Sequence, residues 1–289
     1  MSELKLGIIT DGISQDVETS FKFLNEVGIE YGDLQFIWDK EIGDQTDEEV
    51  KKIKSLMKEY NIKIGCLTRH NFAGLPAKME TLHSNAYNAH MEKYKKCFEI
   101  ANELECPIVR IMSTSKNMIL FGSHGAEKWV TATGAWDAQV ELYREPVAYA
   151  EKMGTMIVTE NCNGGQVTSN YLAKKLIDEL GSDILKILWD PCNAMYCTEK
   201  PYPDGYEVAG DKIGHIHLKD AKIDIAKATV EFRSFGQGDM APYLLDIAKV
   251  LKADNYQGIV SLEANYRPIG KDFVDGTRSS IEHFKKIFG

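Results

Sequence analysis

The sequence repeats one pattern along its length. A short, apolar and often β-branched run is followed by a segment in which apolar residues recur at helical spacing. Such runs are typical of parallel strands that are buried on both faces. The eight runs are Leu6–Ile9, Leu34–Trp38, Lys63–Leu67, Ile108–Met112, Met156–Thr159, Ile187–Trp189, Ile213–Leu218 and Gly258–Leu262. No Pro-, Gly- or Ser-rich linker separates them, which predicts one domain over residues 1–289.

The segments between the runs carry helix signals. Thr46 and Glu49 form a capping-box pattern in front of an apolar stripe. Two further segments carry apolar stripes at helical spacing, which we expect to pack into the core. Their residues are Trp136, Val140, Tyr143, Val147 and Ala150 in one segment, and Leu172, Leu176 and Leu180 in the other.

Eight strand–helix units in 289 residues match a (β/α)8 barrel in both number and size. The alternative is a doubly wound open sheet. That fold usually carries a glycine-rich phosphate turn after its first strand, where this chain reads ITDGIS. We therefore predict a single α/β TIM barrel. Two long loops, at about 114–134 and 221–239, are expected at the carboxyl ends of its strands.

Composition excludes several classes of protein. The 34 basic residues are outnumbered by 43 acidic ones, which disfavours a nucleic-acid partner. No apolar stretch is long enough for a membrane helix, and the start MSELKLGIIT lacks signal-peptide features. The six cysteines are scattered without a CxxC pair, as expected of reduced thiols. These features predict a cytoplasmic protein without a nucleic-acid or membrane partner.

Four of the predicted strands carry, at their carboxyl ends, residues that can bind a metal or move a proton. They are Glu160, Asp190, His217 and Glu263. In a barrel these ends converge, and three carboxylates can share one space only if a cation compensates them. Oxygen-rich ligation with one nitrogen suits Mn²⁺, with Mg²⁺, Co²⁺ or Zn²⁺ as alternatives. The other interpretation is that each acid separately caps a helix or pairs with a lysine.

Two histidines compete for the role of ligand. His215 and His217 lie two positions apart on one predicted strand, so their side chains face the same way. His217 is nearer the carboxyl end and is the predicted ligand, whereas His215 is expected to be a hydrogen-bonded interior residue. Lys219 follows on that face and is a candidate for holding a substrate oxygen.

Together these motifs resemble the sugar phosphate isomerase/epimerase superfamily, whose barrels are xylose isomerase-like or endonuclease IV-like. The resemblance extends over essentially the whole chain. It rests on Glu160, Asp190, the segment HIHLKD at 215–220, the turn GQGD at 236–239 and Glu263.

The resemblance implies an enzyme that uses one divalent ion to isomerise or epimerise a sugar by proton transfer next to a carbonyl, through an enediolate. Glu160 and Glu263 would then remove and return the proton from opposite faces of the substrate. An alternative is a metal-dependent lyase or deglycosidase that cleaves C- or O-glycosidic bonds of 3-oxo-glycosides by elimination. A homo-oligomer is compatible with either activity, and a small β-protein subunit would favour the lyase.

Three positions depart from the pattern of ketose 3-epimerases. Gln166, Asn193 and Ile223 stand where those enzymes carry Glu, His and Arg. This argues against a ketose 3-epimerase in the strict sense. The extra histidine ligands and basic face of an endonuclease are also missing from the pattern, and intact Glu160 and Glu263 disfavour a sugar-binding protein without activity.

Substrate contacts are expected from residues that follow the strands. The predicted set is His70, Lys116, His124, Trp129, Asn193, Lys219 and Arg267. Three of these, Lys116, His124 and Trp129, belong to the long loop after the fourth strand, and such loops are commonly functional. For Arg110, within that strand, either an ion pair inside the barrel or phosphate binding is expected.

Overall fold

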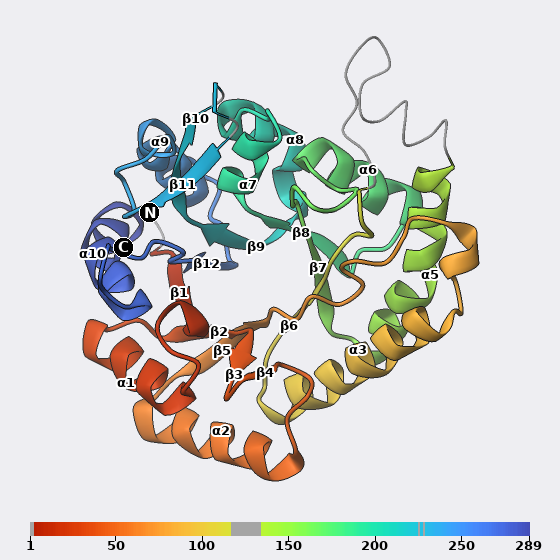
Figure 1. Cartoon of the computed structure of the whole chain (residues 1–289), viewed down its shortest axis with the longest axis horizontal. Coiled ribbons are helices and arrows are strands. Elements are labelled where there is room, and N and C mark those ends of the chain that lie inside the picture. The colour runs from red at the N-terminus through yellow and green to blue at the C-terminus, as the bar shows by residue number, and fades with distance from the viewer. Residues whose placement is uncertain (1–2, 117–133, 225, 228) are drawn as a thin grey trace.

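The computed structural model describes residues 3–116, 134–224, 226–227 and 229–289. Eight parallel strands form a closed barrel in the order β1-β12-β9-β8-β7-β6-β5-β2, and helices surround it (Figure 1). The strands are β1 (Lys5–Ile9), β2 (Tyr31–Leu34), β5 (Lys63–Leu67), β6 (Ile108–Ile111), β7 (Met156–Glu160), β8 (Leu185–Trp189), β9 (Ile213–Leu218) and β12 (Ile259–Leu262). The predicted TIM barrel is confirmed.

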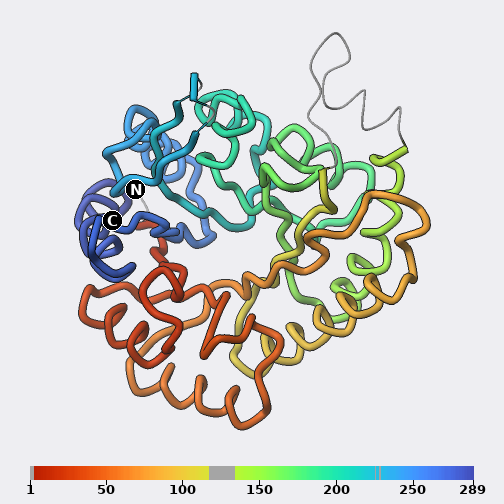
Figure 2. Tube along the Cα trace, in the orientation of Figure 1, coloured from red at the N-terminus to blue at the C-terminus, as the bar shows by residue number. Residues whose placement is uncertain are grey.

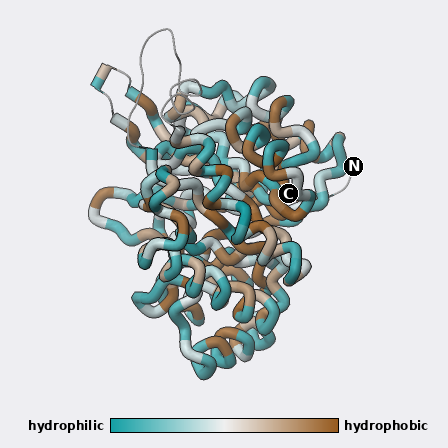
Figure 3. The backbone as a smooth tube through the Cα atoms, turned by 90° about the vertical axis from the view of Figure 1, so that its right-hand side faces the viewer, coloured by the Kyte–Doolittle hydropathy of each residue, from teal (hydrophilic) through white to brown (hydrophobic). Residues whose placement is uncertain are grey.

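The helices also follow the predicted pattern. Thr46 and Glu49 make the capping box at the start of α2, and the apolar stripe of α5 is buried. The helices are α1 (Val17–Val27), α2 (Asp47–Tyr60), α3 (Asn85–Glu103), α5 (Ala135–Met153), α6 (Asn170–Leu180), α7 (Pro191–Tyr196), α8 (Tyr206–Ala209), α9 (Ala241–Ala253) and α10 (Phe273–Phe288). Hydrophobic and hydrophilic residues alternate along the backbone (Figure 3), and the hydrophobic ones form one large buried core. No helix within the described ranges is long and apolar enough to cross a membrane.

The second strand differs from its predicted position at 34–38. It spans Tyr31–Leu34, and the next residues, Phe36–Ile37 (β3), pair antiparallel with Lys40–Glu41 (β4). The apolar pattern missed the strand because Gly32 and Asp33 interrupt it. Both residues have a tertiary reason: a Cβ on Gly32 would lie 3.2 Å from Leu24 of α1, and Asp33 is fully buried inside the barrel.

The chain after β9 forms a hairpin within the predicted loop at 221–239. Its strands, β10 (Asp220–Asp224) and β11 (Thr229–Arg233), pair antiparallel. The Asp220 carboxylate accepts hydrogen bonds from the backbone N–H groups of Gly236, Gly238 and Met240, which ties the returning chain to the barrel. Most of the other predicted loop, at about 114–134, lies outside the described residues.

The first and last strands close the barrel. β1 pairs in parallel with β12, so the loops that follow these two strands are neighbours although they are far apart in sequence (Figure 2). This closure places the segment after Ile9 beside the segment after Leu262 at the carboxyl end of the barrel.

Candidate functional site

Glu160, His217 and Glu263 meet at the carboxyl end of the barrel. Glu160 is the last residue of β7, His217 lies near the end of β9, and Glu263 directly follows β12. Each offers one ligand atom, and these three atoms lie within 4.8 Å of one another. Strand pairing sets this convergence, since the Glu263 backbone N–H donates to the Leu218 carbonyl oxygen at 2.8 Å.

The His217 ring shows whether the residues of this site fit a metal ion. It is fully buried, and its Nδ1 has no hydrogen-bond partner within the described part of the chain. Nδ1 lies 4.0 Å from Glu160 Oε1 and 3.9 Å from Glu263 Oε2. Buried polar atoms are normally satisfied, and a divalent cation would satisfy this nitrogen and both carboxylates at once. The donor set therefore fits a metal ion.

Asp33 orients the histidines, and the sequence analysis missed it. Its Oδ2 lies 2.7 Å from His215 Nε2 and 3.4 Å from His217 Nε2. Burial alone would raise the pKa of Asp33, but its bonds and charge interactions with the two histidines bring it well below its usual range. A carboxylate on one ring nitrogen fixes a histidine so that the other can bind a metal. The sequence signal that could have identified Asp33 was an acidic residue interrupting an apolar run.

Asp190 and Lys219 form a buried ion pair beside this cluster. Lys219 Nζ donates to Asp190 Oδ2 at 2.5 Å and to Glu263 Oε2 at 2.7 Å. The other oxygen of Asp190 caps α7 by accepting from the Asn193 N–H at 2.8 Å. Thus the structure groups three of the four predicted ligands, Glu160, His217 and Glu263, within 4.8 Å of one another. Of the candidate ligand atoms, His217 Nδ1 has no hydrogen-bond partner among the described residues, whereas the carboxylate oxygens of the three acids already accept hydrogen bonds.

The pKa values of two carboxyl groups in this cluster are shifted in opposite directions. Burial raises the pKa of Asp190 more than Lys219 lowers it. For Glu263, burial also raises the pKa, but the Lys219 ammonium and His217 outweigh this and hold it below the usual range. Glu263 is therefore ionised at neutral pH.

Glu160 is held from its other side by Arg110 and Asn193. Arg110 Nη1 donates to Oε2 at 2.7 Å, and Asn193 Nδ2 donates to Oε1 at 3.1 Å. Arg110 is buried, and its guanidinium also donates to the Thr68 carbonyl oxygen. Of the two expectations for Arg110, the structure shows the ion pair inside the barrel. Asn193, predicted as a substrate contact, contacts a predicted catalytic residue.

The remaining predicted substrate contacts are dispersed. His70 Nδ1 lies 2.7 Å from Glu41 Oε1, and the backbone N–H of Lys116 donates to the Gly164 carbonyl oxygen at 3.1 Å. Arg267 lies in the loop between β12 and α10. His124 and Trp129 lie outside the described residues.

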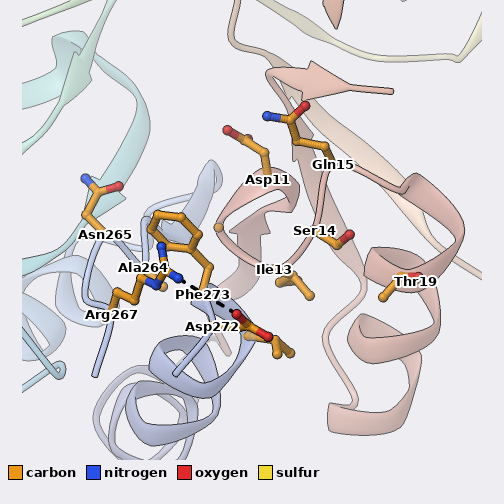
Figure 4. Close-up of a pocket in the computed structure, with 12 residues that line it drawn as sticks. Asp11, Ile13, Ser14, Gln15, Thr19, Ala264, Asn265, Arg267, Asp272 and Phe273 are labelled. Atoms are coloured by element: carbon orange, nitrogen blue, oxygen red, sulfur yellow. Dashed lines mark ion pairs between the residues drawn. The ribbon is translucent and has the colours of Figure 1, made fainter. Parts of the chain in front are cut away.

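A cavity of about 600 Å³ opens between the loops that follow β1 and β12 (Figure 4). Asp11, Ser14 and Gln15 line one side, and Asn265, Arg267 and Phe273 line the other. Asn265 connects the cavity to the carboxylate cluster, because its Nδ2 donates to Glu263 Oε1 at 2.8 Å. Burial, together with the nearby charge of Glu263, raises the pKa of Asp11.

A closed parallel barrel with carboxylates and a histidine at its carboxyl end defines a (β/α)8 protein with a candidate metal centre. The family profile described as "Xylose isomerase-like TIM barrel" matches residues 21–287. The chain belongs to this family.

Solved structures with the same fold include sugar epimerases. The apo form of 3-keto-D-glucoside 4-epimerase, YcjR, from E. coli has a TM-score of 0.73 and 16% identity over 98% of this chain and 100% of that one. D-psicose 3-epimerase with D-tagatose from Clostridium cellulolyticum H10 has a TM-score of 0.70 and 12% identity, with 99% of each chain covered. The IOLI protein with a zinc atom has a TM-score of 0.72 and 14% identity over 99% of this chain and 98% of that one.

Coverage is lower for one fused relative. The chain spans 42% of a fusion of a xylose isomerase-like TIM barrel with 4-hydroxyphenylpyruvate dioxygenase, at 20% identity and a TM-score of 0.67. A search of curated protein sequences finds no match.

Proposed function

We propose that the protein is a cytoplasmic, divalent-metal-dependent sugar isomerase or epimerase that transfers a proton next to the sugar carbonyl. The observation that carries this proposal is the placement of Glu160 and Glu263 about one unpartnered nitrogen of His217. The two carboxylates come from β7 and β12, which β8 and β9 separate around the barrel. They therefore approach the centre from different sides, as removal and return of a proton on two substrate faces requires.

Glu160, His217 and Glu263 would hold the metal, with Mn²⁺ as our first choice and Mg²⁺, Co²⁺ or Zn²⁺ as alternatives. When bound, the cation supplies positive charge that lowers the pKa of the C–H group beside the carbonyl. Asp190 is proposed as a further ligand. Asp190 Oδ2 and Glu263 Oε2 both accept a hydrogen bond from Lys219, so a metal at either oxygen would compete with this ammonium group.

The surrounding side chains prepare the two glutamates for proton transfer. Arg110 and Asn193 orient the Glu160 carboxylate through separate oxygens. Lys219 keeps Glu263 ionised, and its ammonium group is placed to donate a hydrogen bond to a substrate oxygen. Each glutamate can act as base or acid, so the assignment depends on the substrate stereochemistry.

The fold comparisons support a sugar substrate, because the similar structures include 3-keto-D-glucoside 4-epimerase and D-psicose 3-epimerase. The site residues support a difference from D-psicose 3-epimerase. Asn193 is used to orient Glu160, and Gln166 Nε2 donates to the Ser115 carbonyl oxygen at 2.7 Å. We therefore expect the contacts to the sugar to differ from those of a ketose 3-epimerase in the strict sense.

The cavity beside Glu263 favours a second candidate, the lyase that releases an aglycone from 3-oxo-glycosides. A volume of about 600 Å³ is in the range of small-molecule sites and offers room for a leaving group. A small β-protein subunit is the partner expected for this activity. Self-association into a homo-oligomer is compatible with both candidates.

Exchange of substrate C–H with deuterated water separates these functions. In protein loaded with Mn²⁺, NMR should show exchange next to the carbonyl of D-fructose or D-psicose for the isomerase or epimerase. Release of aglycone from a 3-oxo-glycoside would instead support the lyase. Exchange that persists after chelation, with metal loss verified, would contradict metal dependence in either case.

Metal removal also has a readout that does not depend on activity. Because a ligand bound only to the folded state stabilises it by RT ln(1 + [L]/Kd), the Tm should fall on chelation. His217→Ala should abolish this difference and His215→Ala should retain most of it, since His215 faces Asp33 rather than Glu160 and Glu263. The opposite result would reverse the assignment of the ligand.

A further inference from the structure

We propose that the cavity between the loops after β1 and β12 is a subsite for a second, uncharged polyhydroxylated unit of the substrate, such as the glycosyl residue of a disaccharide. The inference rests on the proposed function, because it places the reacting sugar at Glu263. Asn265 lies between the two places: it lines the cavity and donates to Glu263 Oε1 at 2.8 Å. A substrate extending from Glu263 past Asn265 enters this cavity.

The wall formed by the loop after β1 offers polar groups that lack partners. The Oδ1 atom of Asp11 is buried and has no hydrogen-bond partner among the described residues. Gln15 uses its Oε1 to accept from the Asp39 N–H at 3.2 Å. Its Nε2 has no partner in that same part of the structure. One wall thus presents an acceptor and a donor to an incoming hydroxyl-bearing ring.

The opposite wall combines a cation with an aromatic ring. The Arg267 side chain is 58% exposed, and its Nη2 lies 3.9 Å from Asp272 Oδ1, beyond hydrogen-bonding distance. Its guanidinium is centred 5.5 Å from the Phe273 ring, which is itself 43% exposed. Sugars are recognised by such pairs, because hydroxyl groups need hydrogen bonds while the C–H face of the ring packs on an aromatic side chain.

Charge selects against an anionic occupant. Asp11 and Asp272 both line the cavity, and Arg267 is the single basic residue among the lining residues that the structure describes. A phosphate or carboxylate would meet two carboxylates and one cation, whereas a neutral polyol can donate to the carboxylates and accept from Arg267. The surroundings of Arg267 thus favour an uncharged sugar over a sugar phosphate.

The experiment compares ligands that share the same ketose end. Isothermal titration of the Mn²⁺-loaded protein should give Kd values for lactulose and palatinose at least about tenfold lower than for D-fructose. Arg267→Met should weaken binding of both disaccharides and bring this ratio close to one. The matched control is Arg278→Met: Arg278 is 56% exposed, lies 3.7 Å from Glu26 and stacks on Phe23, but is outside the cavity.

A second variant fills the cavity without changing a charged residue. A Cβ on Gly12 would come no closer than 3.5 Å to Ala264, which is an ordinary contact, so Gly12→Leu can place its side chain in the cavity. It should also remove the preference for disaccharides and keep Mn²⁺ affinity.

Three results would overturn the subsite: equal affinity for disaccharides and D-fructose in the unmodified protein, an unchanged ratio in both cavity variants, or tighter binding of D-fructose 6-phosphate through Arg267. Proton exchange on D-fructose is measured separately. It reports on the proposed function whether the subsite survives or fails.

Discussion

The two ends of the barrel interior differ although the same strands build them. On the amino-terminal side of the charged groups, Cys66, Ile108, Val158 and Leu188 form a separate apolar cluster. On the same strand faces, the residues two positions nearer the carboxyl end are charged. Arg110 follows Ile108, Glu160 follows Val158, and Asp190 follows Leu188. The interior therefore changes from apolar to charged within one pleat of three neighbouring strands.

This contrast separates residues that stabilise the fold from residues that perform chemistry. The apolar cluster gains free energy from burial, whereas buried charges cost free energy unless they are paired. At the charged end, Arg110 and Lys219 are paired with three carboxylates, those of Glu160, Asp190 and Glu263. Two cations leave one carboxylate charge uncompensated there, which favours binding of a further cation.

The largest effect, a fall in turnover, is expected from substitution of the two glutamates. Glu160→Gln and Glu263→Gln keep size and a ligating oxygen but cannot accept a proton, and acid–base catalysis contributes about 10²–10⁴-fold. Each variant should lower kcat by that order while metal and substrate still bind. The check is steady-state kinetics together with metal content. Near-normal turnover in both variants, with metal present, would restrict the glutamates to ligation and move the proton chemistry elsewhere.

At the apolar end, truncation should affect stability rather than chemistry. Leu188→Ala leaves a cavity in the packed cluster and should lower the free energy of unfolding by about 2–5 kcal/mol. Urea unfolding measures this change, with Leu245→Ala as the control because Leu245 is 59% exposed. Loss of metal binding in folded Leu188→Ala would show that the two ends are not independent.

Asp33 tests whether a carboxylate behind the histidines supports the metal centre. Asp33→Asn preserves shape but removes the charge that holds His215 and His217. Metal affinity should fall by about 10–100-fold, as is typical when a partner of a ligating histidine is lost. Titration with Mn²⁺ provides the measurement. Unchanged affinity would mean that packing alone orients His217.

The smallest effect is expected from substitution of Lys219, and here the metal affinity should rise rather than fall. Its ammonium group occupies Asp190 and Glu263, so it competes with a metal for these carboxylates. Lys219→Met should raise Mn²⁺ affinity by about tenfold, equivalent to about 1.4 kcal/mol, and lower the Tm of the metal-free protein. Weaker Mn²⁺ binding in a folded variant would contradict the competition and make Lys219 a support of the metal site.

Local sequence patterns were sufficient for the barrel and for much of the candidate site. Apolar runs alternating with helical stripes predicted seven of the eight barrel strands at their positions, because burial on both strand faces imposes that pattern. The same argument indicated Glu160, His217 and Glu263, since a polar residue at the end of a buried strand is visible without knowledge of its partner. The second strand was misplaced because Gly32 and Asp33 are set by contacts with other elements.

The sequence by itself thus determined which strands form the barrel and which of their ends carry ionisable groups. The tertiary structure decided how those groups are paired: Asp33 with His215 across 182 residues, Arg110 with Glu160 across 50, and Lys219 with Asp190 and Glu263. It also placed the cavity between loops from opposite ends of the chain. The physical reason is that periodicity records the burial of each residue, whereas a charge pair or a cavity depends on two segments that only closure of the barrel brings together.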